Sequence, residues 1–136
     1  MIEDLAPRQV WEALMSNPES ALCDVRTNVE WSFVGIPDLT QTGKQPVLIQ
    51  WQVFPTMQPN PKFIEALAQA HIQPTDHIYF ICRSGARSMA AAQAAKEAGY
   101  KFVHNVKDGF EGPPDARNHR GLVAGWKAEG LPWKQG

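Results

Sequence analysis

The sequence has 136 residues, and it contains only two cysteines, little net charge and no long apolar run. Two cysteines are too few for a disulfide framework. The formal net charge of −1 argues against a general affinity for nucleic acid or for an anionic membrane. The first residues are acidic and lack the basic and apolar segments of a signal peptide. We therefore expect a cytoplasmic protein with neither nucleic acid nor a membrane as a partner.

The chain also lacks internal repeats, low-complexity segments and any stretch that separates two domains. Its length suits one domain, which can bury a sufficient core without disulfides or a structural metal. The four histidines are scattered, and none has the spacing of a helical metal site. We expect residues 1–136 to form a single domain that needs no metal.

Strand-like and helix-like segments alternate along the chain. Four apolar residues at 78–81 have no polar face, as expected of a central strand that is covered on both sides. Residues 47–53 alternate between apolar and polar, which indicates a half-buried edge strand. The alternation predicts an α/β fold with a central parallel β-sheet flanked by helices on both faces. The other expected strands are 22–25 and 102–106, and the expected helices are 7–17, 63–71, 89–98 and 122–129.

One short loop joins the predicted central strand to the alanine-rich helix after it. It consists of Cys82, Arg83, Ser84, Gly85, Ala86, Arg87 and Ser88. Backbone N–H groups of the loop and the positive end of the helix favour an anion at the cysteine. No acidic residue lies between positions 76 and 97 to offset the two arginines. A thiol in this setting should ionise more readily than a free cysteine, whose pKa is about 8.5, so we expect a nucleophilic thiolate.

This loop resembles the active-site loop of the rhodanese family of sulfurtransferases, in which the cysteine accepts a sulfur atom as a persulfide. Other stretches resemble that family's opening and closing signatures, and they occur in the family's order. The opening ones are Asp24-Val25-Arg26, Glu30-Trp31 and Gly35-Ile36-Pro37, and the closing ones are Gly109-Phe110-Glu111-Gly112, Gly125-Trp126 and Gly130-Leu131-Pro132. The resemblance spans nearly the whole chain and implies a rhodanese-like domain.

The resemblance, together with the local electrostatics, implies a reaction for Cys82. Its thiolate would take the outer sulfur of thiosulfate or a similar small anionic donor, and sulfite would leave. A thiol, cyanide or a protein thiol would then accept the sulfur. Neither a metal nor an organic cofactor is required. The expected substrate-binding residues are Arg83, Ser84, Gly85, Ala86, Arg87 and Ser88, with the two arginines holding the donor's charge and the loop amides stabilising the sulfur.

Three charged residues, Asp24, Arg26 and Glu30, follow the predicted strand 22–25. Arg26 and Glu30 are four residues apart and can pair if the chain is helical there. We favour a supporting role for the three residues, tying this corner together, over direct chemistry. Cys23 lies within the apolar strand, where a buried cysteine behaves as a small apolar residue rather than a resolving thiol.

Two other functions are compatible with parts of this pattern. A catalytically silent rhodanese-like module could serve binding or regulation, but such modules usually lack the cysteine. Cysteine-dependent phosphatases place five residues between cysteine and arginine, whereas only four separate Cys82 from Arg87. A shorter loop suits one sulfur atom better than a tetrahedral phosphate. The proline-rich connection 54–61 either forms a wall of the active-site mouth or only carries the chain across the surface.

Overall fold

The computed structural model describes residues 2–135, and a five-stranded sheet forms its centre. All of its strand pairs are parallel, in the order β1-β8-β7-β2-β4. The central strand β7 is buried along all but its first residue, as its continuous apolar sequence predicts. The strands of this sheet are β1 (Glu3–Leu5), β2 (Ser20–Asp24), β4 (Val47–Leu48), β7 (His77–Ile81) and β8 (Phe102–Val106).

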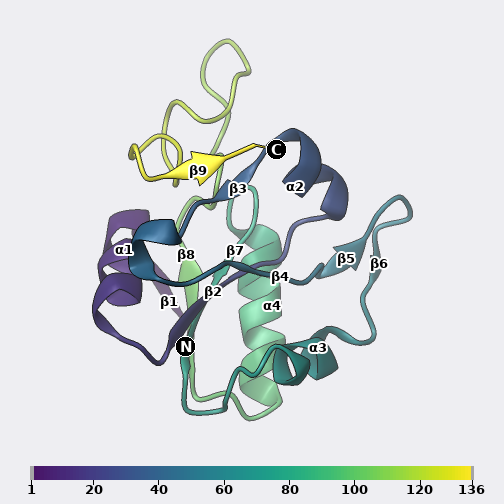
Figure 1. The fold of residues 1–136 in the computed structure, drawn as a ribbon. Helices are drawn as coiled ribbons and strands as arrows, with labels where there is room; N and C mark the ends of the chain where they lie inside the picture. The colour runs from purple at the N-terminus through teal and green to yellow at the C-terminus, as the bar shows by residue number, and fades with distance from the viewer. Residues whose placement is uncertain (1, 136) are drawn as a thin grey trace.

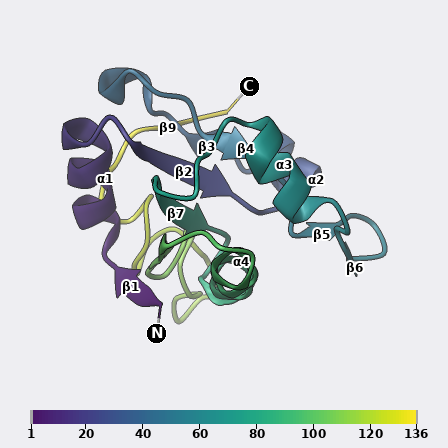
Figure 2. The same cartoon turned by 90° about the horizontal axis from the view of Figure 1, so that it is seen from below.

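Helices cover both faces of the sheet. Figure 2 shows α1 on one side of the strands and α3 and α4 on the other. Each side has its own apolar cluster, one around α1 and the other around α3 and α4. The predicted fold class, an α/β domain with helices on both faces of a parallel sheet, is therefore confirmed. The helices are α1 (Pro7–Ser16), α2 (Asn28–Phe33), α3 (Phe63–Gln69) and α4 (Ala86–Glu97), with a short 3-10 turn, η1 (Thr40–Thr42).

The helices pack on the sheet through small or apolar stripes. In α1, Val10 and Leu14 are fully buried. Met15 lies about 100° around the helix from Leu14, and its side chain is 52% exposed. The buried face of α4 is made of alanines and Ser88, which lets the helix lie close to β7 and β8. The helix begins at Ala86, three residues before the predicted start.

The expected edge strand 47–53 is divided in two. Val47–Leu48 forms the sheet edge as β4, but Gln52–Val53 forms β5, which pairs in an antiparallel hairpin with β6 (Gln58–Pro59). The division occurs because the neighbouring strand β2 ends at Asp24, so the chain beyond position 51 lacks a parallel partner. Figure 1 shows this hairpin projecting from the body of the molecule.

Two terminal segments differ from the sequence expectation. The predicted helix 122–129 is wrong, because these residues form turns in which Gly125 has φ +102°, a value outside the helical range. The chain then forms β9 (Trp133–Lys134), which pairs with β3 (Ile36–Pro37). Strand β1 was not predicted. Figure 1 shows β3, β9 and α2 beyond the carboxyl ends of the central strands.

Candidate active site

Cys82 lies directly after β7, at the carboxyl end of the central strand. Three groups approach its sulfur: Gly85 N at 3.1 Å, Ser88 N at 3.3 Å and Ser88 Oγ at 3.2 Å. Gly85 has φ +117°, which allows the loop to turn sharply into α4. The cysteine is only 1% exposed. The loop thus holds the sulfur at the start of α4 with its donors converging on one point.

The segment after β8 fixes the backbone of this loop from behind. Phe110 N donates to Cys82 O at 2.7 Å, and Glu111 N donates to Arg83 O at 2.9 Å. Gly109 makes this approach possible, because a Cβ there would collide with Cys82 O and with the Arg83 backbone. The closing family-like stretch is therefore a support for the cysteine loop, 27 residues after Cys82 in the sequence at Gly109.

A two-point ion pair joins the loop to α2. Arg87 donates to both carboxylate oxygens of Glu30, at 2.7 and 3.0 Å. The condition for an Arg26–Glu30 pair is not met, because Arg26 precedes α2 and binds Asp24 instead. Burial alone would raise the pKa of Glu30, but the hydrogen bonds and charge of Arg87 and the Thr27 N–H lower it below its usual range. The hydrogen bonds to Glu30 likewise raise the pKa of Arg87.

Asp24 and Arg26 form a separate, fully buried ion pair, with Arg26 Nη2 2.6 Å from Asp24 Oδ2. Arg26 Nη2 also donates to Gly35 O at 2.7 Å, and its guanidinium lies over the Phe110 ring at 4.3 Å. The three charged residues of the opening signature therefore do not form one cluster. Asp24 and Arg26 tie the end of β2 to the chain near β3, whereas Glu30 contacts the cysteine loop.

A cavity of about 430 Å³ opens at the loop, and it carries both signs of charge. Arg83 and Arg87 face Glu30 and Glu111 in its lining, so the positive field expected from sequence is offset in space. Met57 also lines it, which brings the proline-rich connection to the mouth. The complete lining is Glu30, Val34, Gln52, Met57, Arg83, Arg87 and Glu111.

The structure distributes the expected substrate-binding residues over three positions. Gly85 and Ser88 contact the sulfur, Arg83 and Arg87 line the cavity, and Ser84 and Ala86 are exposed on the loop. Sequence reasoning missed Glu111 and Asn105 as site residues. Glu111 lay within a quoted signature, and Asn105, at the end of a strand, accepts a hydrogen bond from Ser88.

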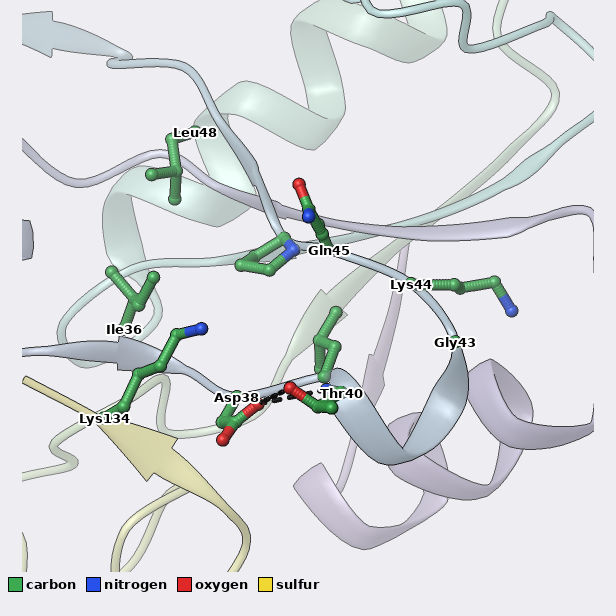
Figure 3. Close-up of a pocket in the computed structure, with 10 residues that line it drawn as sticks. Ile36, Asp38, Thr40, Gly43, Lys44, Gln45, Leu48 and Lys134 are labelled. Atoms are coloured by element: carbon green, nitrogen blue, oxygen red, sulfur yellow. Dashed lines mark hydrogen bonds between the residues drawn. The ribbon is translucent and has the colours of Figure 1, made fainter.

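Cys23 lies in the same core cluster as Cys82, and a second cavity lies apart from the cysteine loop. Cys23 is fully buried in the core, where burial raises its pKa well above the usual value. A cavity of about 480 Å³ lies near η1, and none of its lining residues belongs to the cysteine loop (Figure 3). Lys134 reaches into it, while the Lys44 amine is bound to the carbonyls of Leu14 and Asn17.

Across residues 2–135 no cluster of three side chains suits a metal ion, and no helix is long and apolar enough to span a membrane.

Comparison with known proteins identifies the family. The family model described as the STR4 middle domain matches residues 4–136. The chain belongs to the STR4 middle domain family. The chain is 34% identical over 133 residues to the uncharacterized protein RC0915 of Rickettsia conorii, across 98% of both chains. It is also 46% identical to Rv0390 of M. tuberculosis, whose crystal structure matches with a TM-score of 0.90 over 98% of both chains.

More distant structures share the fold of this chain. The polysulfide-sulfur transferase homodimer of Wolinella succinogenes matches with a TM-score of 0.67 at 23% identity, covering 99% of this chain and 80% of that one. The rhodanese-like domain of the Anabaena protein Alr3790 matches with a TM-score of 0.62 at 19% identity, covering 99% and 80%. The rhodanese-like fold expected from the sequence is therefore confirmed.

Proposed function

We propose that this protein is a sulfurtransferase that carries a sulfane sulfur on Cys82 as a persulfide. The observation that carries the proposal is the convergence of Gly85 N, Ser88 N and Ser88 Oγ on Cys82 Sγ, all within 3.3 Å. Donors fixed in this way stabilise negative charge on sulfur without reorganising during the reaction. The sulfur-transfer activity named for the structurally similar Wolinella protein supports the same chemistry.

The reaction proceeds in two displacements at sulfur. The Cys82 thiolate attacks the outer sulfur of thiosulfate, an S–S bond forms to Sγ, and the original S–S bond breaks so that its electron pair leaves with sulfite. A thiolate or cyanide then attacks the outer sulfur of the persulfide, and the electron pair of that S–S bond returns to Sγ. The second step regenerates the Cys82 thiolate, and neither step requires a metal or an organic cofactor.

The charged residues of the mouth receive the substrates. Arg83 is exposed at the mouth and attracts the anionic donor. Arg87 is oriented by Glu30 and lines the same cavity as Arg83, where its charge contributes to binding the anionic donor. Because Glu30 and Glu111 also line the cavity, the sulfite that forms is not held by unopposed positive charge. The proposed acceptor is a small thiol or a protein thiol in the reducing cytoplasm, with cyanide as its substitute in an assay.

Thiocyanate formation from thiosulfate and cyanide tests this function. Wild type and Cys23→Ala should turn over at similar rates, because Cys23 is fully buried in the core, whereas Cys82→Ser should be inactive. If wild type transfers sulfur from neither thiosulfate nor polysulfide, the proposal fails and a silent binding module takes its place. Hydrolysis of p-nitrophenyl phosphate by wild type but not by Cys82→Ser would instead support a phosphatase.

A further inference from the structure

A chain of hydrogen bonds, buried at the sulfur and partly exposed at its far end, connects Cys82 Sγ to the first strand of the sheet. Ser88 Oγ donates to Asn105 Oδ1, and Asn105 Nδ2 donates to Asp4 Oδ1 at 2.9 Å. Asp4 and Asn105 are direct neighbours in the β1–β8 register, so both point to the face covered by α4. Ser88 and Asn105 are buried, at 0% and 3% exposure, while Asp4 is at the solvent-exposed end.

The Ser88 hydroxyl has one hydrogen but several acceptors within reach. Its oxygen lies 3.2 Å from Cys82 Sγ and 3.2 Å from Gly85 O, in addition to its short contact with Asn105. Asn105 cannot turn its amide around, because Nδ2 faces two acceptors, Asp4 Oδ1 and Gly85 O. Its Oδ1 is therefore held toward Ser88, where it competes with the sulfur for one hydrogen.

Asp4 strengthens this competition. A carboxylate that accepts from Asn105 Nδ2 polarises the amide and makes Oδ1 a better acceptor, as hydrogen-bonded chains do in a medium of low dielectric constant. In this set of hydrogen bonds the Asp4 carboxylate contacts Asn105, and it contacts neither Ser88 nor Cys82 Sγ. Its hydrogen-bonded effect on Ser88 passes through Asn105, and its charge also acts on the sulfur through space.

We propose that Asn105, held by Asp4, is a positioning residue that controls when the Ser88 hydroxyl donates to Cys82. The proposal rests on the proposed function only in taking Cys82 Sγ as the reacting atom. When Cys82 is protonated, its S–H donates to Ser88 Oγ, and the Ser88 hydroxyl donates to Asn105 Oδ1. When the thiol proton leaves to solvent, the hydroxyl turns to the sulfur anion and Asn105 Oδ1 loses its donor.

The arrangement makes opposite predictions for two adjacent side chains. Ser88→Ala removes a hydrogen-bond donor from the sulfur anion, so the thiolate becomes less stable relative to the thiol. Asn105→Leu has a similar volume but removes the Oδ1 acceptor, which leaves Gly85 O, at 3.2 Å, as the remaining competitor for the Ser88 hydroxyl. The hydroxyl then donates to the sulfur anion more readily, so the thiolate becomes more stable relative to the thiol. The charged residues of the neighbouring cavity, Arg87 with Glu30, Arg83 and Glu111, are the same in both variants.

The test is the pH profile of Cys82 alkylation by iodoacetamide, measured on the tryptic peptide that contains Cys82 and not Cys23. Ser88→Ala should move the midpoint up by about one pH unit. Asn105→Leu should move it down by at least about half a unit, and the double variant should match Ser88→Ala. A midpoint for folded Asn105→Leu that equals or exceeds the wild-type value overturns the proposal, as does a double variant that keeps the downward shift.

Variants of Asp4, at the solvent-exposed end of these hydrogen bonds, provide the second measurement in case Asn105→Leu does not fold. Asp4→Ala should lower the midpoint by less than Asn105→Leu, and Asp4→Asn, which retains an acceptor oxygen, should lie between Asp4→Ala and wild type. An unchanged midpoint in Asp4→Ala overturns the role of Asp4. Alkylation needs no sulfur donor, so these results stand apart from any failure of sulfur transfer.

Discussion

Glu30 and Arg87, 57 positions apart in the sequence, form a two-point ion pair with N–O distances of 2.7 and 3.0 Å. Their side chains are 19% and 20% exposed, so water screens the pair only in part. The pair connects α2 to the helix that starts at the cysteine loop. It therefore orients the arginine that the proposed reaction uses, and it also stabilises the fold.

The acid stability of the protein should depend on Glu30. Arg87 lowers the pKa of Glu30 below its unfolded value of about 4.3, so the pair stabilises the fold above that pH. The stabilisation is lost as the pH falls through the lower folded pKa. Urea unfolding should show Glu30→Gln about 1 kcal/mol less stable than wild type at neutral pH. This difference should shrink below about pH 4, and a difference that stays constant down to pH 3 would contradict the assignment.

Arg87 should matter through its geometry as well as its charge. Arg87→Ala should lower kcat/KM for thiosulfate by about tenfold or more, because both the charge and the contact with Glu30 are lost. Arg87→Lys keeps the charge without the two-point contact, so its kcat/KM should be intermediate. Steady-state kinetics with thiosulfate and cyanide measure kcat/KM for the three proteins. A wild-type value for Arg87→Ala would show that Arg87 does not contribute to the reaction.

The buried pair of Asp24 and Arg26 should be a major contributor to stability. Arg26→Met leaves the Asp24 carboxylate buried without its partner, at a cost of about 3–5 kcal/mol. Adding Asp24→Asn to this variant removes the stranded charge and should restore part of the loss. Urea unfolding of the three proteins measures both effects. A loss below about 1 kcal/mol for Arg26→Met would show that the pair is not structural.

Cys23 should be dispensable for sulfur transfer, but a polar side chain at its position should destabilise the protein. Burial raises its pKa, so it should stay unalkylated at neutral pH in the folded protein. Cys23→Ala should keep the wild-type rate of sulfur transfer. Cys23→Ser places a hydroxyl in the apolar core and should cost about 1–3 kcal/mol. Loss of sulfur transfer in a folded Cys23→Ala protein would indicate a resolving role instead.

The sheet and the cysteine loop could be predicted because their sequence signals are local. The run 78–81 has no polar face, so it could only be a covered strand, and Gly85 marks the turn into α4. The helix predicted at 122–129 does not form because Gly125 adopts φ +102°, which lies outside the helical range. Strand β1 was missed because three residues carry no periodicity, and two of them are exposed acids.

The pairing of charges could not be read from sequence spacing. Arg26 stands four residues before Glu30, but the turn after β2 directs it back onto Asp24, and Glu30 is left for Arg87. Likewise, Asp4 contacts Asn105 across 101 positions, a relation set by the β1–β8 register. Such contacts depend on strand order, which the local pattern does not determine.

The most direct test of the account is intact-protein mass spectrometry of wild type and Cys82→Ser after incubation with thiosulfate, before and after cyanide. A persulfide at Cys82 predicts that wild type gains the mass of one sulfur atom, that cyanide removes it, and that Cys82→Ser never gains it. An equal gain in Cys82→Ser would place the sulfur elsewhere. No gain in wild type with either thiosulfate or polysulfide would contradict sulfur transfer through Cys82.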